Sequence, residues 1–223
     1  MSVVIVRFPG TNCEYDTKYA FDILNAKSTI INYDENCLPN DTKLVVLPGG
    51  FSYGDYLRSG ALAKMSNIMN SIKIFASSGG MVLGICNGFQ ILTEVGLLPG
   101  ALKRNDNTHF ISKFQHIKVV NNDNKFLQLY KTNELLNIPV AHHDGAYYID
   151  KVGLDSLKKN QQILLRYCDK DGALEVLNGS LEQIAGICNT TKNVFGLMPH
   201  PERAMEILLG SDDGKNMLEG LVC

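Results

Sequence analysis

The chain has 223 residues with 21 basic and 23 acidic side chains, and because neither sign forms a block, nucleic acid and anionic membranes are not expected as partners. The N-terminus lacks the basic residues and long apolar segment of a signal peptide, and no stretch of about 18 apolar residues could form a membrane-spanning helix. We therefore expect a soluble, cytoplasmic protein. The six cysteines lack paired C-x-x-C spacing, which indicates neither a zinc site nor a secreted disulfide framework.

The first 47 residues follow the order strand, helix, strand, strand. Ser2–Phe8 is a β-branched run closed by proline and glycine, and apolar residues recur at helical spacing over Cys13–Ala26. Two further apolar runs, Ser28–Tyr33 and Lys43–Leu47, predict the next strands. This order indicates the α/β class, with one domain over residues 1–223.

A glycine-rich loop follows the strand that ends at Leu47, and a helix over residues 60–77 is predicted after it. The loop has no Gly-Lys-Ser/Thr ending, and Asp55 would repel phosphate, so a phosphate-binding loop is not favoured. An ordinary tight turn remains open. If the sheet edge carries an activated nucleophile, the N–H of Gly50 is instead a candidate donor to an oxyanion.

The segment Met81–Leu92 predicts a strand, a sharp turn and a helix, with Cys86 at the corner. The Gly-x-Cys-x-Gly spacing, which includes Gly84 and Gly88, matches the nucleophile elbow that α/β hydrolases build around serine. The helix that begins at Asn87 points unpaired N–H groups towards the sulfur, and the N–H of Asn87 is a second candidate oxyanion donor. The remaining cysteines are interpreted as structural: Cys13, Cys37, Cys168, Cys188 and Cys223.

Residues 101–180 are less regular. Rough alternation or apolar runs predict strands over Phe114–Val120, Asn137–His142 and Gln161–Cys168, which we expect to cap the sheet. His142 and His143 are adjacent, and adjacent strand residues point to opposite faces, so they form a poor chelating pair. No metal site is predicted.

The C-terminal region offers the partners that a nucleophilic cysteine needs. A buried strand over Val194–Met198 leads into Pro-His-Pro-Glu, and the flanking prolines hold His200 extended at the strand end. Pro201 is expected to start the final helix, with Glu202 in its first turn. An imidazole that protonates the leaving amine and a carboxylate that fixes its tautomer would then lie at the same edge as Cys86. A plain strand-to-helix connection is the alternative.

These motifs carry a family resemblance. Gly-Ile-Cys-Asn-Gly at 84–88, together with Pro-His-Pro-Glu at 199–202, is similar to the motifs of class I glutamine amidotransferases. More narrowly, residues 8–14, 48–58, 84–90, 139–142 and 196–203 resemble the glutaminase subunits of phosphoribosylformylglycinamidine synthases. The most specific match is Gly-Gly-Phe-Ser-Tyr-Gly-Asp at 49–55. The resemblance implies a flavodoxin-like, open and mostly parallel sheet with helices on both faces, as one type-1 glutamine amidotransferase domain.

The resemblance also implies a chemistry. Glutamine would be hydrolysed to glutamate and ammonia through a thioester on Cys86, with His200 as acid and base and Glu202 orienting it. Gly50 and Asn87 would supply the oxyanion amides. The residues expected near the glutamine are Phe51 and Gln90.

In the family the ammonia passes to a large synthetase subunit. That subunit uses ATP, with magnesium, to convert formylglycinamide ribonucleotide into formylglycinamidine ribonucleotide in de novo purine biosynthesis, often together with a small third subunit. The present chain has no nucleotide loop, so no cofactor is expected on it. One motif departs from the family: where the family usually reads His-Gly-Glu-Gly, this chain has His-His-Asp-Gly at 142–145, so His143 replaces glycine and Asp144 replaces glutamate.

Two other classes stay open from the sequence. A cysteine hydrolase resembling the intracellular-peptidase superfamily would share the elbow, but that group places histidine directly after the nucleophile, where this chain has Asn87. The second class is a non-catalytic subunit that keeps the fold only for assembly into a complex. The intact Cys86, His200 and Glu202 argue against it.

Overall fold

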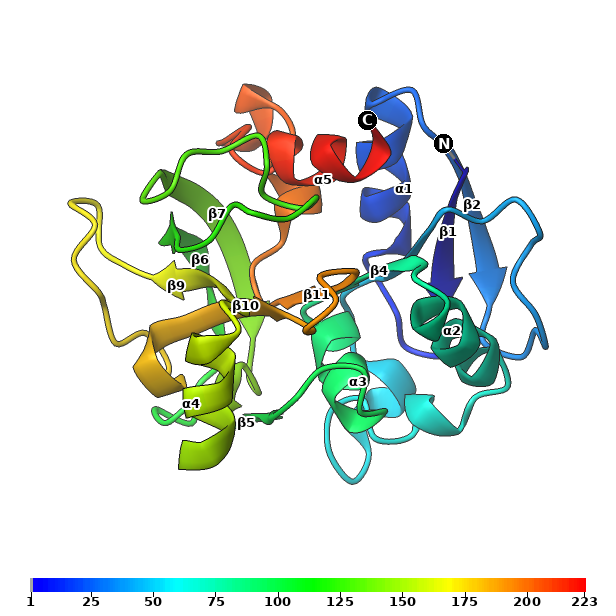
Figure 1. Ribbon diagram of the computed structural model, residues 1–223, viewed down its shortest axis with the longest axis horizontal. Helices are drawn as coiled ribbons and strands as arrows, with labels where there is room; N and C mark the ends of the chain where they lie inside the picture. Colours follow the sequence, from blue (N-terminus) through cyan, green and yellow to red (C-terminus); the bar gives the residue numbers. More distant parts are fainter. Residues whose placement is uncertain (1) are drawn as a thin grey trace.

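One nine-stranded sheet runs through the computed structural model, which describes residues 2–223 (Figure 1). Its first five strands are all paired in parallel, in the order β2 (Lys27–Asn32), β1 (Ser2–Arg7), β3 (Leu44–Leu47), β4 (Met81–Ile85) and β11 (Val194–Leu197). Strands β3 and β11 are buried along their whole length, and β4 is buried except for its first residue, Met81. The α/β class and the N-terminal strand order are therefore confirmed.

The same sheet continues beyond β11 with antiparallel pairs. The next strands are β10 (Ile184–Cys188), β9 (Ile163–Tyr167), β6 (Ile111–Val119) and β7 (Leu135–His142). The expectation that this region caps the sheet is therefore wrong, because its strands extend the sheet by edge-to-edge pairing. A separate two-stranded ladder is formed by β5 (Ala101–Lys103) and β8 (Ala146–Tyr148).

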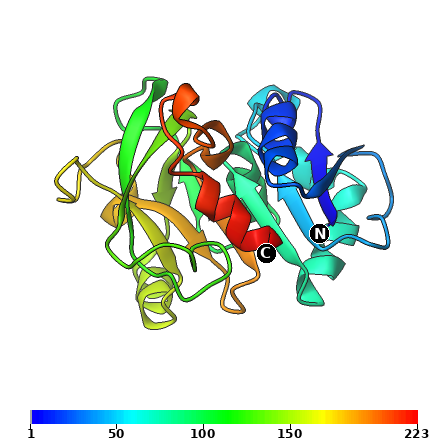
Figure 2. The same ribbon diagram turned by 90° about the horizontal axis from the view of Figure 1, so that it is seen from above.

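Helices cover both faces of the sheet (Figures 1 and 2). On one face lie α1 (Glu14–Ile23) and α5 (Lys215–Val222), which contact each other. On the other face lie α2 (Ile68–Ser77), α3 (Asn87–Glu94) and α4 (Lys151–Lys159). The short 3-10 turns are η1 (Ser52–Asp55), η2 (Ala63–Met65), η3 (Leu181–Gln183), η4 (Pro201–Arg203) and η5 (Ile207–Leu209).

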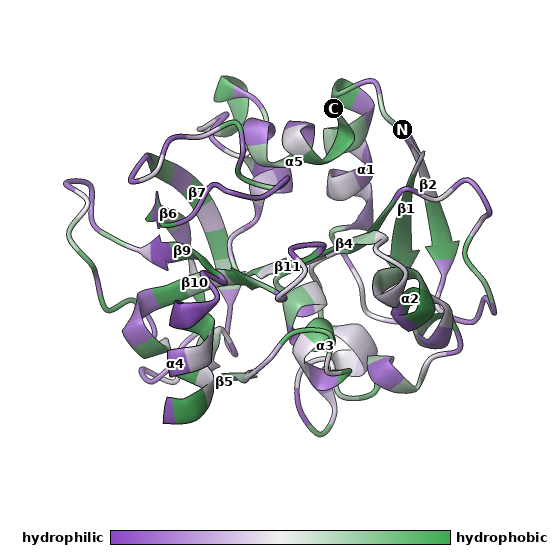
Figure 3. Ribbon diagram, viewed as in Figure 1, coloured by the Kyte–Doolittle hydropathy of each residue, from purple (hydrophilic) through white to green (hydrophobic). Residues whose placement is uncertain are grey.

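The hydrophobic core lies between the sheet and these helices. Figure 3 shows hydrophobic residues gathered on the interior strands and hydrophilic residues on the outer loops. Phe89 of α3 stacks on Tyr147 of β8, and Phe126 stacks on Phe195 of β11, so these large aromatic side chains help to fill the core. Within residues 2–223, no helix is both long and apolar enough to span a membrane.

Two helix predictions are wrong, and one helix was missed. The helix expected over residues 60–77 is interrupted at Ser66, whose backbone is extended and whose hydroxyl contacts Tyr53. Pro201 starts only a 3-10 turn, since Ala204 leaves helical geometry and its carbonyl accepts from the N–H of Gly214. Helix α4 follows Asp150, which caps it by accepting from the N–H of Gly153 at 2.7 Å.

Candidate active site

Cys86 occupies a sharp turn between β4 and α3. Its backbone has φ 50° and ψ −105°, a strained conformation for a residue with a side chain. The turn is held because the N–H of Cys86 donates to the carbonyl oxygen of Leu197 on β11 at 2.8 Å. A Cβ on Gly88 would lie 1.8 Å from the carbonyl oxygen of Leu47, so only glycine fits there. The predicted nucleophile elbow is therefore present.

The thiol of Cys86 faces the end of β7. Its Sγ lies 3.6 Å from the carbonyl oxygen of Ala141, and the residue as a whole is buried. Strands β4 and β7 are far apart in the sequence and in the sheet order. The contact therefore brings two distant parts of the sheet together at Cys86.

His200 and Glu202 form a buried pair just after β11. The Nδ1 of His200 lies 2.7 Å from Oε1 of Glu202, and the two side chains are 2% and 0% exposed. The N–H of His200 donates to the carbonyl oxygen of Pro139 at 2.8 Å, which fixes the loop against β7. Burial opposes a charge on His200, but the Glu202 carboxylate and then Cys86 outweigh it, and the pKa of His200 lies well above its ordinary value.

A cavity of about 250 Å³ opens onto these groups. Of the residues predicted from sequence, Cys86, His200, Gly50 and Phe51 line it. Phe51 is 42% exposed and its ring lies 6.4 Å from that of Phe110, so the two aromatic rings stand together at the cavity. Lining residues that the sequence reasoning did not find are Asn12, Cys13, Phe110, Ser112, Ala141 and Arg203.

Gly50 reaches the cavity through a close backbone crossing. Its φ is 147°, and a Cβ there would lie 2.7 Å from the Cα of Thr11 and 2.8 Å from the carbonyl oxygen of Gly10. The position therefore excludes any side chain.

Asn87 begins helix α3, where backbone N–H groups lack intrahelical acceptors. Its side chain bridges two loops: Oδ1 accepts from the N–H of Ser52 at 3.1 Å, and Nδ2 donates to Oε1 of Gln90 at 2.8 Å. Since Ser52 lies two residues after Gly50, this bridge fixes the two candidate oxyanion donors relative to each other.

Gln90 is almost fully buried and is absent from the cavity lining. Its Oε1 accepts from Nδ2 of Asn87 at 2.8 Å, and its Nε2 donates to the carbonyl oxygen of Asp144 at 2.6 Å. Both polar ends of Gln90 are therefore used within the protein.

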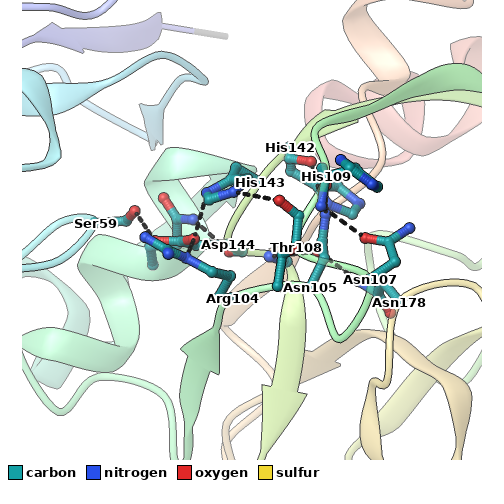
Figure 4. A network of polar contacts seen from close by, with 12 residues as sticks. Ser59, Arg104, Asn105, Asn107, Thr108, His109, His142, His143, Asp144 and Asn178 are labelled. Atoms are coloured by element: carbon teal, nitrogen blue, oxygen red, sulfur yellow. Dashed lines mark hydrogen bonds and ion pairs between the residues drawn. The ribbon is translucent and has the colours of Figure 1, made fainter.

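Asp144 stands at the centre of a polar network in the loop between β7 and β8 (Figure 4). Its carboxylate accepts from the hydroxyl of Ser59 at 3.0 Å and lies 3.0 Å from Nδ1 of His143 and 3.8 Å from Nε of Arg104. Burial, together with the nearby Asp144 charge, raises the pKa of Asp55 to about 6, although Ser59 opposes the shift.

Asn105 anchors the start of the same loop. Its Nδ2 donates to the carbonyl oxygens of His142 and His109, both at 2.9 Å, so its Oδ1 faces Nδ1 of His142 at 3.2 Å. Because the Oδ1 of Asn105 can only accept a hydrogen bond, Nδ1 of His142 must carry the ring hydrogen. Burial, and then the charge of His200, lowers the pKa of His142 to about 4, so this ring is neutral.

The comparisons with known proteins agree with this architecture. The model of the CobB/CobQ-like glutamine amidotransferase domain matches residues 1–215. The phosphoribosylformylglycinamidine synthase subunit PurQ of Sulfurimonas denitrificans is 59% identical over 222 residues, covering 100% of this chain and 99% of the relative. The PurQ subunit of Wolinella succinogenes is 60% identical over 223 residues, covering both chains completely.

Solved structures give the same picture of the fold. The structure of PurLQS from Thermotoga maritima superposes with a TM-score of 0.88 at 42% identity, covering 99% of this chain and 97% of that one. A glutamine amidotransferase from the same organism is only 17% identical but superposes with a TM-score of 0.66 over 100% of this chain and 96% of that one. The flavodoxin-like α/β fold expected from the sequence is therefore confirmed.

Proposed function

Because the chain belongs to the CobB/CobQ-like glutamine amidotransferase family, and within it to the PurQ subunits, we propose that it supplies ammonia to a phosphoribosylformylglycinamidine synthase. It is the glutaminase subunit of that enzyme and hydrolyses glutamine to glutamate and ammonia. The observation that carries this function is the arrangement of Cys86 beside the buried His200–Glu202 pair on one cavity.

Acylation begins with attack of the Cys86 sulfur on the side-chain amide carbon of glutamine. The carbon–sulfur bond forms, and the carbonyl oxygen becomes an oxyanion that the N–H groups of Gly50 and Asn87 stabilise. A donor of this kind is worth about 100- to 1,000-fold in kcat. His200 gives its proton to the leaving nitrogen, the carbon–nitrogen bond breaks, and ammonia departs from a γ-glutamyl thioester.

Deacylation uses the same groups in reverse roles. His200 takes a proton from water, which attacks the thioester carbon, and the Cys86 sulfur leaves as glutamate forms. Glu202 keeps the imidazole oriented, with Nδ1 towards the carboxylate and Nε2 available to sulfur, water and ammonia. In keeping with this, Nε2 of His200 has no hydrogen-bond partner among residues 2–223.

The glutamine is expected to pass Phe51 at the cavity mouth. Gln90 contributes to binding through Asn87 and Asp144, whose positions it fixes. No cofactor takes part in these steps. ATP and magnesium are assigned to the synthetase subunit, which consumes the ammonia.

The partner is the large synthetase subunit, and a small third subunit completes the assembly. This proposal is supported by the name of the matched structure, PurLQS, and by the identity of this chain to it. The reaction served is the conversion of formylglycinamide ribonucleotide to formylglycinamidine ribonucleotide. A cytoplasmic location stays a prediction from the sequence.

The test is to reconstitute the complex and to measure amidine formation with either glutamine or ammonia as nitrogen donor. We expect Cys86→Ala to abolish the glutamine-driven reaction and to leave the ammonia-driven one unchanged. Cys37→Ala, which removes an exposed cysteine, is the matched control. Equal glutamine-driven rates for the parent and Cys86→Ala would exclude the proposed nucleophile and support a non-catalytic subunit.

A further inference from the structure

A second buried cysteine lies beside the catalytic histidine and has no part in the proposed mechanism. Cys13 precedes α1 and lines the same cavity as Cys86 and His200. A Cβ built on Gly49 would lie 3.0 Å from the Sγ of Cys13 and 2.7 Å from Cε1 of His200. The thiol and the imidazole therefore approach each other across the space that this glycine leaves free.

Cys13, His200 and Glu202 bring three different metal-ligating groups together. One donor atom from each residue lies within 4.8 Å of the other two, and all three residues are buried. Glu202 uses Oε1 for the imidazole, but its Oε2 is buried and has no partner within the described part of the chain. The cluster thus holds an unused carboxylate oxygen beside a thiol and an imidazole.

We propose that this cluster is a reversible, inhibitory site for Zn²⁺. Thiolate, imidazole and carboxylate are the three ligand types of protein zinc sites, at roughly 2.0 to 2.3 Å from the ion. Such bond lengths place tetrahedral donors about 3 to 4 Å apart, so the cluster needs to contract only slightly. The cavity leaves the fourth position to water, and binding displaces two protons, one from the thiol of Cys13 and one from a ring nitrogen of His200.

The charges in the cluster suit a divalent ion. The Cys13 thiolate and the Glu202 carboxylate together neutralise the charge of Zn²⁺. This neutralisation lowers the free-energy cost of burying the ion. Arg203 is the opposing charge, since its Nη2 donates to the Sγ of Cys13 at 3.1 Å. Its side chain is 36% exposed and its Nε is held by Asp16 at 3.0 Å, so Nη2 can turn towards solvent while that ion pair persists.

Bound zinc stops glutamine hydrolysis because it occupies His200 and Glu202. With its lone pair on the metal, the imidazole can neither take a proton from water nor give one to ammonia. The inhibition rests on the proposed function, whereas the binding of the ion does not, so the two are measured separately.

The binding test uses Co²⁺ as a spectroscopic substitute for Zn²⁺ on the full chain, reduced with a phosphine that does not bind the metal. We expect a thiolate-to-cobalt charge-transfer band in the near ultraviolet, at one ion per chain, that Zn²⁺ bleaches. Cys13→Ser keeps an acceptor for Arg203 but removes the thiolate, so the band should vanish. Cys86→Ala and Cys37→Ala should both keep it.

The inhibition test measures glutamine hydrolysis against Zn²⁺ concentration, with each variant compared to its own metal-free rate. We expect chelator-reversible inhibition of the parent and of Cys37→Ala, and a half-inhibitory concentration at least about tenfold higher for Cys13→Ser. A band that survives in Cys13→Ser, or one that is lost in Cys86→Ala, places the metal on another thiol and overturns the proposal. Absence of any band in the parent overturns it equally.

Discussion

Replacing Glu202 by glutamine removes the carboxylate charge that His200 faces while keeping the size of the side chain. The two groups are 2.7 Å apart and shielded from water. At an effective dielectric constant of roughly 20, that separation gives an attraction of about 6 kcal/mol between carboxylate and imidazolium. Burial of the charges offsets part of it. We therefore expect the loss of about 3 to 5 kcal/mol of transition-state stabilisation, or roughly 100- to 5,000-fold in kcat.

The assay is glutamine-driven amidine formation by the reconstituted complex, with the ammonia-driven rate as the internal standard. The KM for glutamine should change little, because Glu202 does not line the cavity. The pH profile should change as well. Since the Glu202 carboxylate raises the pKa of His200, its removal should move the alkaline limb of the kcat profile to lower pH.

Glu206→Gln is the matched control, because Glu206 accepts from the hydroxyl of Tyr19 at 2.8 Å and is not in contact with the imidazole. A kcat for Glu202→Gln within about fivefold of the parent, with an unmoved pH profile, would refute the idea that this carboxylate orients and charges His200. An equal loss of the ammonia-driven rate would show instead that the substitution damages the complex, and the fall in kcat would then not measure the contribution of the carboxylate.

Other substitutions test the surrounding structure. Gln90→Ala cuts the link from Asn87 to the loop after β7, so kcat should fall about tenfold and urea unfolding should show a loss of about 1 to 3 kcal/mol; parent-like values would remove its positioning role. Gly88→Ala places a Cβ 1.8 Å from the Leu47 carbonyl oxygen, so more than about 4 kcal/mol should be lost in urea unfolding, and a stable variant would contradict this geometry. Burial raises the pKa of Asp55 to about 6, above its unfolded value, so the parent should melt at higher temperature as pH falls from 7 to 5; Asp55→Asn should lack this gain.

Local sequence signals were sufficient wherever a short segment determines its own geometry. The elbow at Cys86 follows from its two flanking glycines and the adjoining apolar run. Pro201 keeps the residue before it out of the helical region, and His200 has φ −106° and ψ 84°, which is non-helical but short of the extended geometry expected. The interior of β1 and the whole of β3 are β-branched or apolar, and β4 is apolar apart from Gly84, as is typical of buried parallel strands.

Features that depend on distant contacts were not found. The helix expected at residues 60–77 is interrupted at Ser66, which contacts Tyr53, and no local breaker residue marks that point. Cys13 appeared to be one structural cysteine among several, because only folding brings it to His200 and Arg203. Helix α4 is different, since Asp150 was a local capping signal that was not used.

The position of β11 in the sheet has a consequence for synthesis on the ribosome. Strand β11 (Val194–Leu197) lies between β4 and β10, although it is the last strand to be made. Until it emerges, β4 presents an unpaired edge in the middle of the future molecule, and such edges are prone to join other chains. The same strand delivers His200, so a nascent chain cannot release ammonia before its sheet is closed. Closure of the sheet and the arrival of the catalytic histidine thus depend on the same segment of the chain.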